Sequence, residues 1–150
     1  MVDVHEKAIR SKNMSAIRSK DTKPEIWLRK QLHARGYRYR LNHPHLPGKP
    51  DLVFNKFKSV IFVNGCFWHM HSCPLFKVPK TRTDWWLQKL SKNKERDQES
   101  IKQLEQDGWK VLTVWECAIK KSQKNNGADL LALITHWIEN ETTSKSIPSS

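Results

Sequence analysis

The chain has 150 residues, which suits one domain of ordinary size, since domains cluster at about 100–150 residues. Hydrophobic residues make up 37% of it and include seven Trp and five Phe, which excludes disorder of the whole chain. No run reaches the ~18 apolar residues that a membrane span needs, and residues 1–14 are too charged for a signal peptide. These observations predict a cytoplasmic protein.

The chain is strongly basic. Lys and Arg number 27 against 15 Asp and Glu, which gives a net charge of +12, and the pI is near 9.8. A pI above ~9 on one domain is typical of nucleic-acid binders, although a merely basic surface would give the same value. The basic residues gather in residues 7–23 and 77–102, where apolar or aromatic residues lie between the charges. Such a mixture suits both phosphates and bases and favours nucleic acid as the partner.

The N-terminal part predicts a basic arm followed by a helix. Residues 1–20 have a weakly helical pattern and many cations. Thr22 suits a helix N-cap, Glu25 completes a Thr-x-x-Glu capping box, and Gly36 is a natural helix end. We therefore expect a DNA-contacting arm over residues 1–20 and a single domain over residues 21–140.

Short strands follow the first helix. Residues 37–41 alternate apolar and basic side chains, as a half-exposed strand does. A turn-rich segment over residues 42–50 leads to two short apolar runs, 51–54 and 59–63, which predict a hairpin.

The C-terminal half predicts two helices around one strand. Residues 83–107 have a helical pattern, 109–115 form a strong strand, and 128–140 form an amphipathic helix. Residues 141–150 are rich in Ser and Thr and are expected to be a disordered tail. The order of elements predicts an α/β layer sandwich.

All three cysteines and one histidine form a candidate zinc site. Cys66, His71 and Cys73 lie within eight residues, and Cys117 follows the 109–115 strand, whose end can lie beside theirs. Three thiolates and an imidazole are a tetrahedral structural zinc set. The alternatives are separate buried thiols or a disulfide, which a reducing cytoplasm disfavours.

A second cluster of polar residues lies around the hairpin. Asp51 opens a strand after a Pro/Gly turn and could hold Mg²⁺, although an Asp after Pro more often caps a turn. The next strand runs into Asn64 and then into His69, which could act as a base or contact a phosphate. Asp97 lies mid-helix among charges and has no role that its own context predicts.

Two adjacent aromatic pairs lie in basic surroundings. They are Phe67-Trp68 and Trp85-Trp86. One ring of such a pair usually belongs to the core, but a Gly/Cys loop cannot easily bury both rings of the first pair. Exposed rings beside Lys and Arg can wedge between base steps.

Several motifs together resemble the very short patch repair (Vsr) endonuclease family. They run in order from the N-terminus to about residue 138: Asn13-Met14, Leu46-Pro47-Gly48-x-Pro50-Asp51, Gly65-Cys66-Phe67-Trp68-His69, Leu75-Phe76-Lys77-Val78-Pro79, Thr81-Arg82-Thr83 and Val114-Trp115-Glu116-Cys117. The resemblance implies a restriction-endonuclease-like, three-layer α/β/α core with a small mixed sheet and a structural zinc. It also implies an enzyme that nicks one DNA strand 5′ to the T of a T·G mismatch left by deaminated 5-methylcytosine.

The resemblance assigns catalytic and metal-binding roles. It makes Asp51 the Mg²⁺ ligand together with the backbone carbonyl of Val63, His69 the general base and Asp97 its orienting partner. It also matches the zinc ligands Cys66, His71, Cys73 and Cys117. The family commonly has His where this chain has Asn64, an amide that can contact a phosphate but cannot move a proton.

The resemblance also assigns DNA contacts and partners. Phe67, Trp68 and Trp86 match an aromatic wedge, Met14 and Ile17 match an N-terminal element in the minor groove, and Lys89 and Asn93 match further DNA contacts. The implied substrate is double-stranded DNA with a T·G mismatch, bound by a monomer, with mismatch-repair proteins and a cognate cytosine methyltransferase as further partners.

Two other interpretations stay open from the residues alone. The first is a zinc-stabilised DNA-binding module in which Asn64 marks a weak or lost active site. The second is an ordinary restriction nuclease, which predicts a further acid and a Lys on the 59–63 strand, where Phe62 and Asn64 stand instead.

Overall fold

The computed structural model describes residues 22–66, 77 and 79–148 of the chain. These ranges contain α2 (Lys23–Ala34), β1 (Arg40–Leu41), β2 (Leu52–Phe54), a 3-10 turn (Asn55–Phe57), β3 (Ser59–Asn64), α3 (Thr83–Gln106), β4 (Lys110–Trp115), α4 (Glu116–Gln123), α5 (Ala128–Asn140) and β5 (Lys145–Ile147). The predicted hairpin, long helix, strong strand and last helix are confirmed within a residue or two. The predicted N-terminal arm over residues 1–20 lies outside the described residues.

The strands form one mixed sheet in the order β1-β2-β3-β4-β5. The pairs β1–β2 and β2–β3 are antiparallel, whereas β3–β4 and β4–β5 are parallel. A parallel neighbour requires a crossover connection, and α3 spans the connection between β3 and β4. The C-terminal ends of the parallel strands β3 and β4 therefore lie at the same edge of the sheet.

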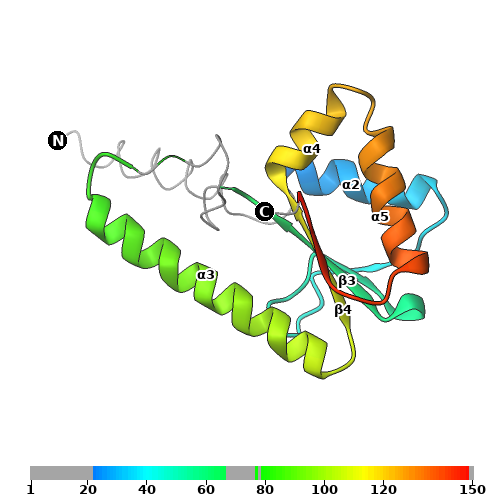
Figure 1. Ribbon diagram of the computed structural model, residues 1–150, viewed down its shortest axis with the longest axis horizontal. Helices are drawn as coiled ribbons and strands as arrows, with labels where there is room; N and C mark the ends of the chain where they lie inside the picture. Colours follow the sequence, from blue (N-terminus) through cyan, green and yellow to red (C-terminus); the bar gives the residue numbers. More distant parts are fainter. Residues whose placement is uncertain (1–21, 67–76, 78, 149–150) are drawn as a thin grey trace.

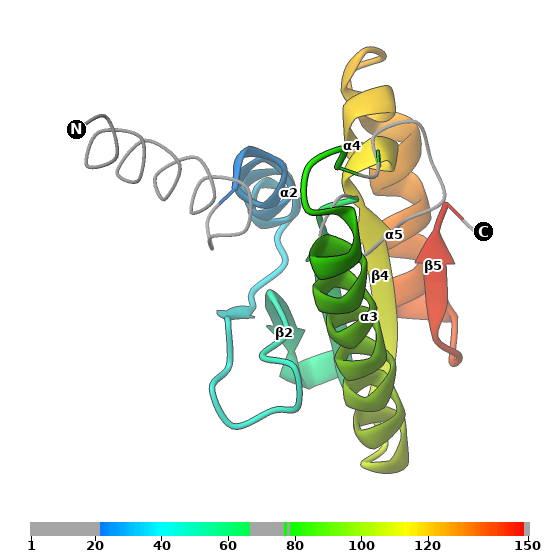
Figure 2. The ribbon, with the colours of Figure 1, turned by 90° about the vertical axis from the view of Figure 1, so that its left-hand side faces the viewer.

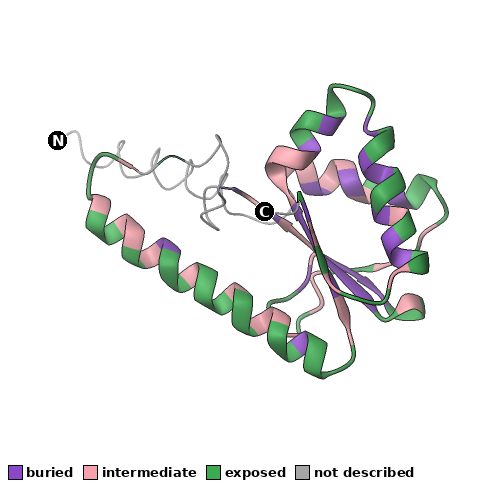
Figure 3. Cartoon of the chain, in the orientation of Figure 1, coloured by how far each residue is buried: buried purple, intermediate pink, exposed green. Residues whose placement is uncertain are grey.

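Helices cover both faces of the sheet (Figures 1 and 2). Because side chains alternate along a strand, Phe54 and Ile61 pack with α2, α4 and α5, while Val53 and Val60 pack with Leu104 of α3. The buried residues concentrate in the sheet and on the inward faces of the helices (Figure 3). The expected mixed α/β architecture is confirmed. Among the described residues no helix is long and apolar enough to cross a bilayer.

Helix α3 is much longer than the strands it covers. Its 24 residues extend about 36 Å, whereas the six residues of β3 extend about 20 Å. Ile101 and Leu104 near its C-terminal end pack against the sheet. Its N-terminal half therefore projects past the edge where β3 ends (Figure 1).

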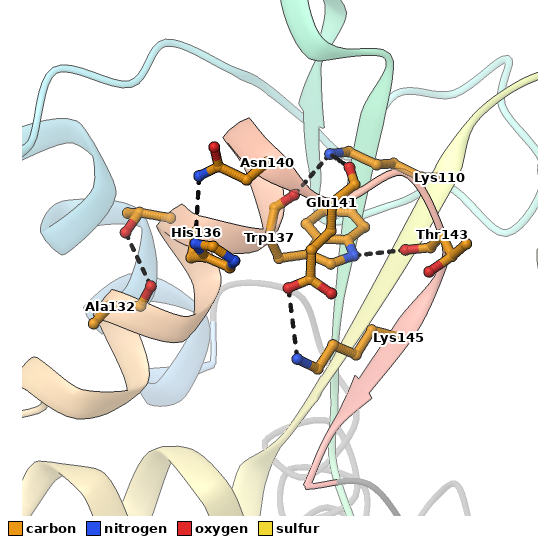
Figure 4. A network of polar contacts seen from close by, with 9 residues as sticks. Lys110, Ala132, His136, Trp137, Asn140, Glu141, Thr143 and Lys145 are labelled. Atoms are coloured by element: carbon orange, nitrogen blue, oxygen red, sulfur yellow. Dashed lines mark hydrogen bonds and ion pairs between the residues drawn. The ribbon is translucent and has the colours of Figure 1, made fainter.

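Lys110 anchors the last helix to the sheet (Figure 4). Its Nζ donates hydrogen bonds of 2.7 Å to the carbonyls of Trp137 and Ile138 and a further one to the carbonyl of Glu141. A cation is favourable at a helix C-terminus, where carbonyls lack partners inside the helix. Burial lowers the pKa of Lys110, but the carbonyls compensate for the lost solvation.

The C-terminal segment differs from its prediction as a disordered tail. Residues Lys145–Ile147 form β5, which pairs in parallel with Leu112–Val114. Two serine hydroxyls fix this edge strand: Ser144 Oγ accepts the Val111 N–H at 2.9 Å, and Ser146 Oγ accepts the Trp115 Nε1–H at 2.9 Å. Polar side chains that suggested fraying are thus partners of β4. Only Arg40–Leu41 of the predicted 37–41 strand pairs, and α4 was not predicted.

Candidate active site and metal centre

Asp51 joins the turn before β2 to the end of β3. Its Oδ2 accepts a hydrogen bond of 2.7 Å from the backbone N–H of Val63. The antiparallel register, in which Leu52 faces Ile61, places Asp51 beside the last residues of β3. The two residues that the sequence analysis assigned to Mg²⁺ therefore lie next to each other.

Gly48 seats the loop that carries Asp51 against α3. Its φ is +73°, a conformation that side chains disfavour, and an added Cβ would lie 2.9 Å from Ser100 Cβ and 3.2 Å from Phe62 Cε1. The glycine of the Leu46-Pro47-Gly48 motif thus permits a close approach of loop to helix. Ser100 is three residues from Asp97, so this approach also brings the loop toward the α3 segment that carries Asp97.

Glu25 is a second acid near Asp51, although its sequence context predicts mainly a capping role. Thr22 is the N-cap residue of α2, but its side chain forms no capping bond to the backbone. Its hydroxyl instead donates to Glu25 Oε1 at 3.3 Å, and Arg29 forms an ion pair of 3.1 Å with Glu25 Oε2. Glu25 is only 5% exposed. The sequence signal for a site role was only an acid in the first turn of a helix. The Thr-x-x-Glu capping pattern explains such an acid equally well.

The two carboxylates interact electrostatically. Burial raises the pKa of Asp51 to about 7, and the negative charge of Glu25 also raises it, while the Val63 N–H and Arg29 act in the opposite direction. A carboxylate that is costly to ionise beside a second acid is stabilised in its charged form by a cation. Hard divalent cations such as Mg²⁺ prefer oxygen ligands, so the residues present fit a magnesium site.

The other catalytic candidates lie on β3 and α3. Asn64 is the last residue of β3, is 8% exposed, and faces Trp115 in the β4 register. Asp97 is half-buried and shares one face of α3 with Leu90 and Leu104, both fully buried. Asp51, Val63 and Asn64 thus gather where β3 ends. His69 lies outside the described residues.

Two of the four expected zinc ligands lie at this same edge. Cys66 follows β3 by two residues and Cys117 follows β4 by two residues, and the parallel register pairs Asn64 with Trp115. The Cys66 N–H donates to Glu116 Oε1 at 3.2 Å, so the two segments are in contact. The structure records both cysteines as thiols. Their placement fits a shared metal, while His71 and Cys73 lie outside the described residues.

The aromatic and DNA-contact candidates are described in part. Trp86 is half-buried and packs edge-to-face on Trp85, with ring centroids 4.9 Å apart. Lys89 and Asn93 follow on α3 and are half-buried. The remaining candidates, namely Phe67, Trp68, Met14 and Ile17, lie outside the described residues.

A mixed sheet that gathers acids and thiols at one edge, on a basic chain, indicates a candidate enzyme that acts on nucleic acids. The family model for the DNA mismatch endonuclease Vsr matches residues 2–75. The chain is 48% identical to the DNA mismatch endonuclease Vsr of Escherichia coli (strain K12) over 147 residues, which cover 98% of this chain and 94% of that protein. It belongs to the Vsr endonuclease family.

Nicking enzymes are also among the similar proteins. The type II nicking enzyme V.NmeAIP of Neisseria meningitidis is 48% identical over 120 residues, 80% of this chain and 86% of that protein. The type II nicking enzyme V.XorIIP of Xanthomonas oryzae is 46% identical over 106 residues, 71% of this chain and 78% of that protein.

Proposed function

We propose that this protein is a Mg²⁺-dependent, strand-specific DNA endonuclease that nicks 5′ to the T of a T·G mismatch. Its substrate would be cytoplasmic DNA in which 5-methylcytosine has deaminated, and the nick would start a very short repair. The observation that carries the proposal is the interacting acid pair of half-buried Asp51, beside the end of β3, and buried Glu25 of α2, in a member of a mismatch endonuclease family.

Asp51 and the carbonyl of Val63 are the residues that would hold Mg²⁺. The bound ion would neutralise charge that develops on the phosphate during hydrolysis. The Val63 N–H, 2.7 Å from Asp51 Oδ2, keeps the carboxylate at the strand end. Glu25 adds a second negative charge there, and Arg29 holds its carboxylate in place.

The remaining polar residues would position the phosphate and move a proton. We assign His69 as the general base and Asp97 as the residue that orients it. The amide of Asn64 at the end of β3 can donate a hydrogen bond to a phosphate oxygen. These roles divide the chemistry between the acids that would bind the metal and a histidine that would act as the base.

A structural zinc would hold the sheet edge together. Cys66 and Cys117 already lie in contacting segments, and His71 and Cys73 would complete a tetrahedral set without an open position for chemistry. The zinc would thus fix the segment that starts with Phe67 and Trp68, the rings assigned to the wedge.

The mismatch would be recognised by its weaker stacking and pairing. A T·G wobble pair opens at lower cost than a Watson–Crick pair, so rings inserted by Phe67, Trp68 and Trp86 would favour it. Met14 and Ile17 would approach from the minor groove. Lys89 and Asn93 would contact the DNA near the mismatch.

The experiment is a nicking assay with Mg²⁺ on a panel of duplexes that differ only in one base pair. Each duplex carries T·G, T·A, C·G or another mismatch in several flanking sequences. We expect a single nick 5′ to the mismatched T, and no nick in the paired duplexes. Cleavage of paired DNA at a comparable rate would contradict the proposal.

A DNA-binding module with little activity is the second candidate, and Asn64 is the observation that favours it. An enzyme that needs a proton moved at the end of β3 would be slow with an amide there, by up to ~10²–10⁴-fold. Mismatch binding without measurable nicking would support this candidate.

A further inference from the structure

Helix α3 and its N-cap residue carry a basic stripe, of which the proposed function uses only Lys89. The stripe consists of one exposed indole and four cations at alternating spacings of three and four residues: Arg82, Trp85, Lys89, Lys92 and Arg96. This spacing places Trp85, Lys89, Lys92 and Arg96 in one row along the helix, and Arg82 precedes them as the N-cap residue. All are exposed except Lys89, which is half-buried.

The stripe is separate from the face of α3 that meets the fold. The inward face carries Leu90, Asp97 and Leu104, and the stripe lies about a quarter turn away around the helix, since each residue advances about 100°. Exposed residues line the projecting half of α3 (Figure 3). The row is thus a side of the helix that the sheet does not cover.

Trp85 is the aromatic residue of this stripe. It is 41% exposed, one of three large hydrophobic side chains that are exposed in the described part of the chain. The Arg82 guanidinium lies 4.9 Å from its ring centroid and the Lys89 ammonium 5.3 Å. Cation–π contacts of this kind hold the two charges beside the ring.

The cations of the stripe have no acidic partners within the described residues. The three ion pairs found there lie on α2, on α4 and near β5. The four cations, none of them in an ion pair with a described residue, span about 21 Å from Arg82 to Arg96, and a DNA strand, with one charge per ~3.4 Å of its axis, presents about six phosphates over that length. Charge complementarity therefore selects a polyanion as the occupant.

We propose that the stripe is a track for the backbone of one DNA strand beside the mismatch. The cations pair with phosphates of that strand, and the Trp85 ring packs on a deoxyribose between them. This contact rests on the proposed function for its partner, but it is independent of base sequence and of the mismatch. Trp85 would therefore contribute to affinity for any duplex, unlike the wedge residues Phe67 and Trp68.

The test measures binding of the full chain to a paired duplex and to its T·G counterpart by fluorescence anisotropy without Mg²⁺. We expect W85A to weaken both complexes by the same factor, about 3- to 10-fold, since part of an exposed ring loses its contact. W85F retains a ring and should recover most of the affinity. The matched control is L133A, which truncates another exposed apolar residue, 48% exposed on α5, and should change neither affinity.

The salt dependence tests the charges. R82A, K92A and R96A should each reduce the slope of log affinity against log salt concentration by about 0.9, while W85A should leave the slope unchanged. The proposal is overturned if these variants keep the wild-type slope, or if W85A binds the paired duplex as the wild type does. A loss confined to the T·G duplex would also overturn it, because Trp85 would then be part of the wedge.

Failure of the proposed function gives a different result. A wild-type protein that binds paired and T·G duplexes equally and does not nick would contradict mismatch repair. The paired-duplex measurements on W85A and on the charge variants would still decide the role of the stripe.

Discussion

Asp51 Oδ2 lies 2.7 Å from the backbone nitrogen of Val63, across the β2–β3 hairpin. This bond fixes a half-buried carboxylate at the end of a buried strand, near a second acid, the buried Glu25. Burial at this position raises the pKa of the Asp51 carboxyl to about 7. Its ionisation, its protonation and its metal binding are therefore linked, and the linkage can be measured.

The first prediction concerns the pH dependence of nicking. Mg²⁺ binds the ionised carboxylate, so at low Mg²⁺ the rate should rise with pH through about 7, the pKa of Asp51. More Mg²⁺ competes better with the proton and should move the midpoint to lower pH. Single-turnover rates at pH 5.5–8.5 and several Mg²⁺ concentrations measure this. A midpoint that does not respond to Mg²⁺ would exclude Asp51 as the titrating ligand.

The second prediction concerns stability without Mg²⁺. The native Asp51 binds its proton up to about pH 7 and the unfolded one only up to 3.8, so the native state loses stability as pH rises between these values. Asp51→Asn removes this loss. Between pH 4 and pH 8 the wild type should therefore lose ~1–4 kcal/mol more free energy of unfolding than the variant does. Urea unfolding of zinc-loaded protein at both pH values is the measurement. If the free energy of unfolding changes with pH equally in the wild type and in Asp51→Asn, Asp51 is not the group that causes the loss.

The third prediction concerns Glu25. Glu25→Gln removes a negative charge beside Asp51 and should lower the pKa of Asp51, because that charge raises it. The pH midpoint of nicking should fall, and the Mg²⁺ concentration for half-maximal rate should rise, as one charge near the ion is lost. Glu99→Gln is the control, since Glu99 is an exposed acid on α3. A midpoint unchanged in Glu25→Gln would return Glu25 to a purely structural role.

The fourth prediction concerns zinc. Cys117→Ser should lower the zinc content from near one per chain and reduce the free energy of unfolding, because a structural zinc contributes to folding. Metal analysis of purified protein and thermal unfolding measure both. Cobalt substitution gives a second readout, since thiolate ligands produce a charge-transfer band that Cys117→Ser should weaken. A folded wild type without zinc would contradict the site.

Sequence patterns predicted the elements that bury large apolar side chains. The run of residues 109–115 and the spacing of 128–140 depend on local composition, and β4 and α5 confirm them. Strand β5 could not be predicted, because its pairing depends on Ser144 and Ser146 meeting β4 groups far along the chain. Helix α4 is only eight residues long and follows a strand directly.

The candidate site likewise contains residues that local sequence predicts and one that only distant contacts reveal. Asp51 and the Cys66–Cys117 edge followed from position and spacing, because strand ends in one sheet lie together. Glu25 did not, since its sequence context matches a capping box equally well. Only the fold shows that its carboxylate meets Arg29 and influences Asp51.

The fifth prediction concerns Asn64. If the family's histidine mainly moves a proton, Asn64→His should increase the single-turnover nicking rate by up to ~10²–10⁴-fold, whereas a positioning role predicts little change. We expect only a small gain, because Asp51, Glu25 and Asp97 are all present in this chain. A large gain would show that the chain is catalytically weak and would favour the binding module.

The central claim is that Asp51 holds the metal of a strand-specific mismatch nickase. Its most direct test is single-turnover cleavage of a T·G duplex with each strand separately labelled, for the wild type and Asp51→Asn at pH 8. We predict Mg²⁺-dependent cleavage of the T strand alone by the wild type, and none by Asp51→Asn, although that variant still binds the duplex. Cleavage by Asp51→Asn at the wild-type rate, or of both strands by the wild type, would contradict the claim.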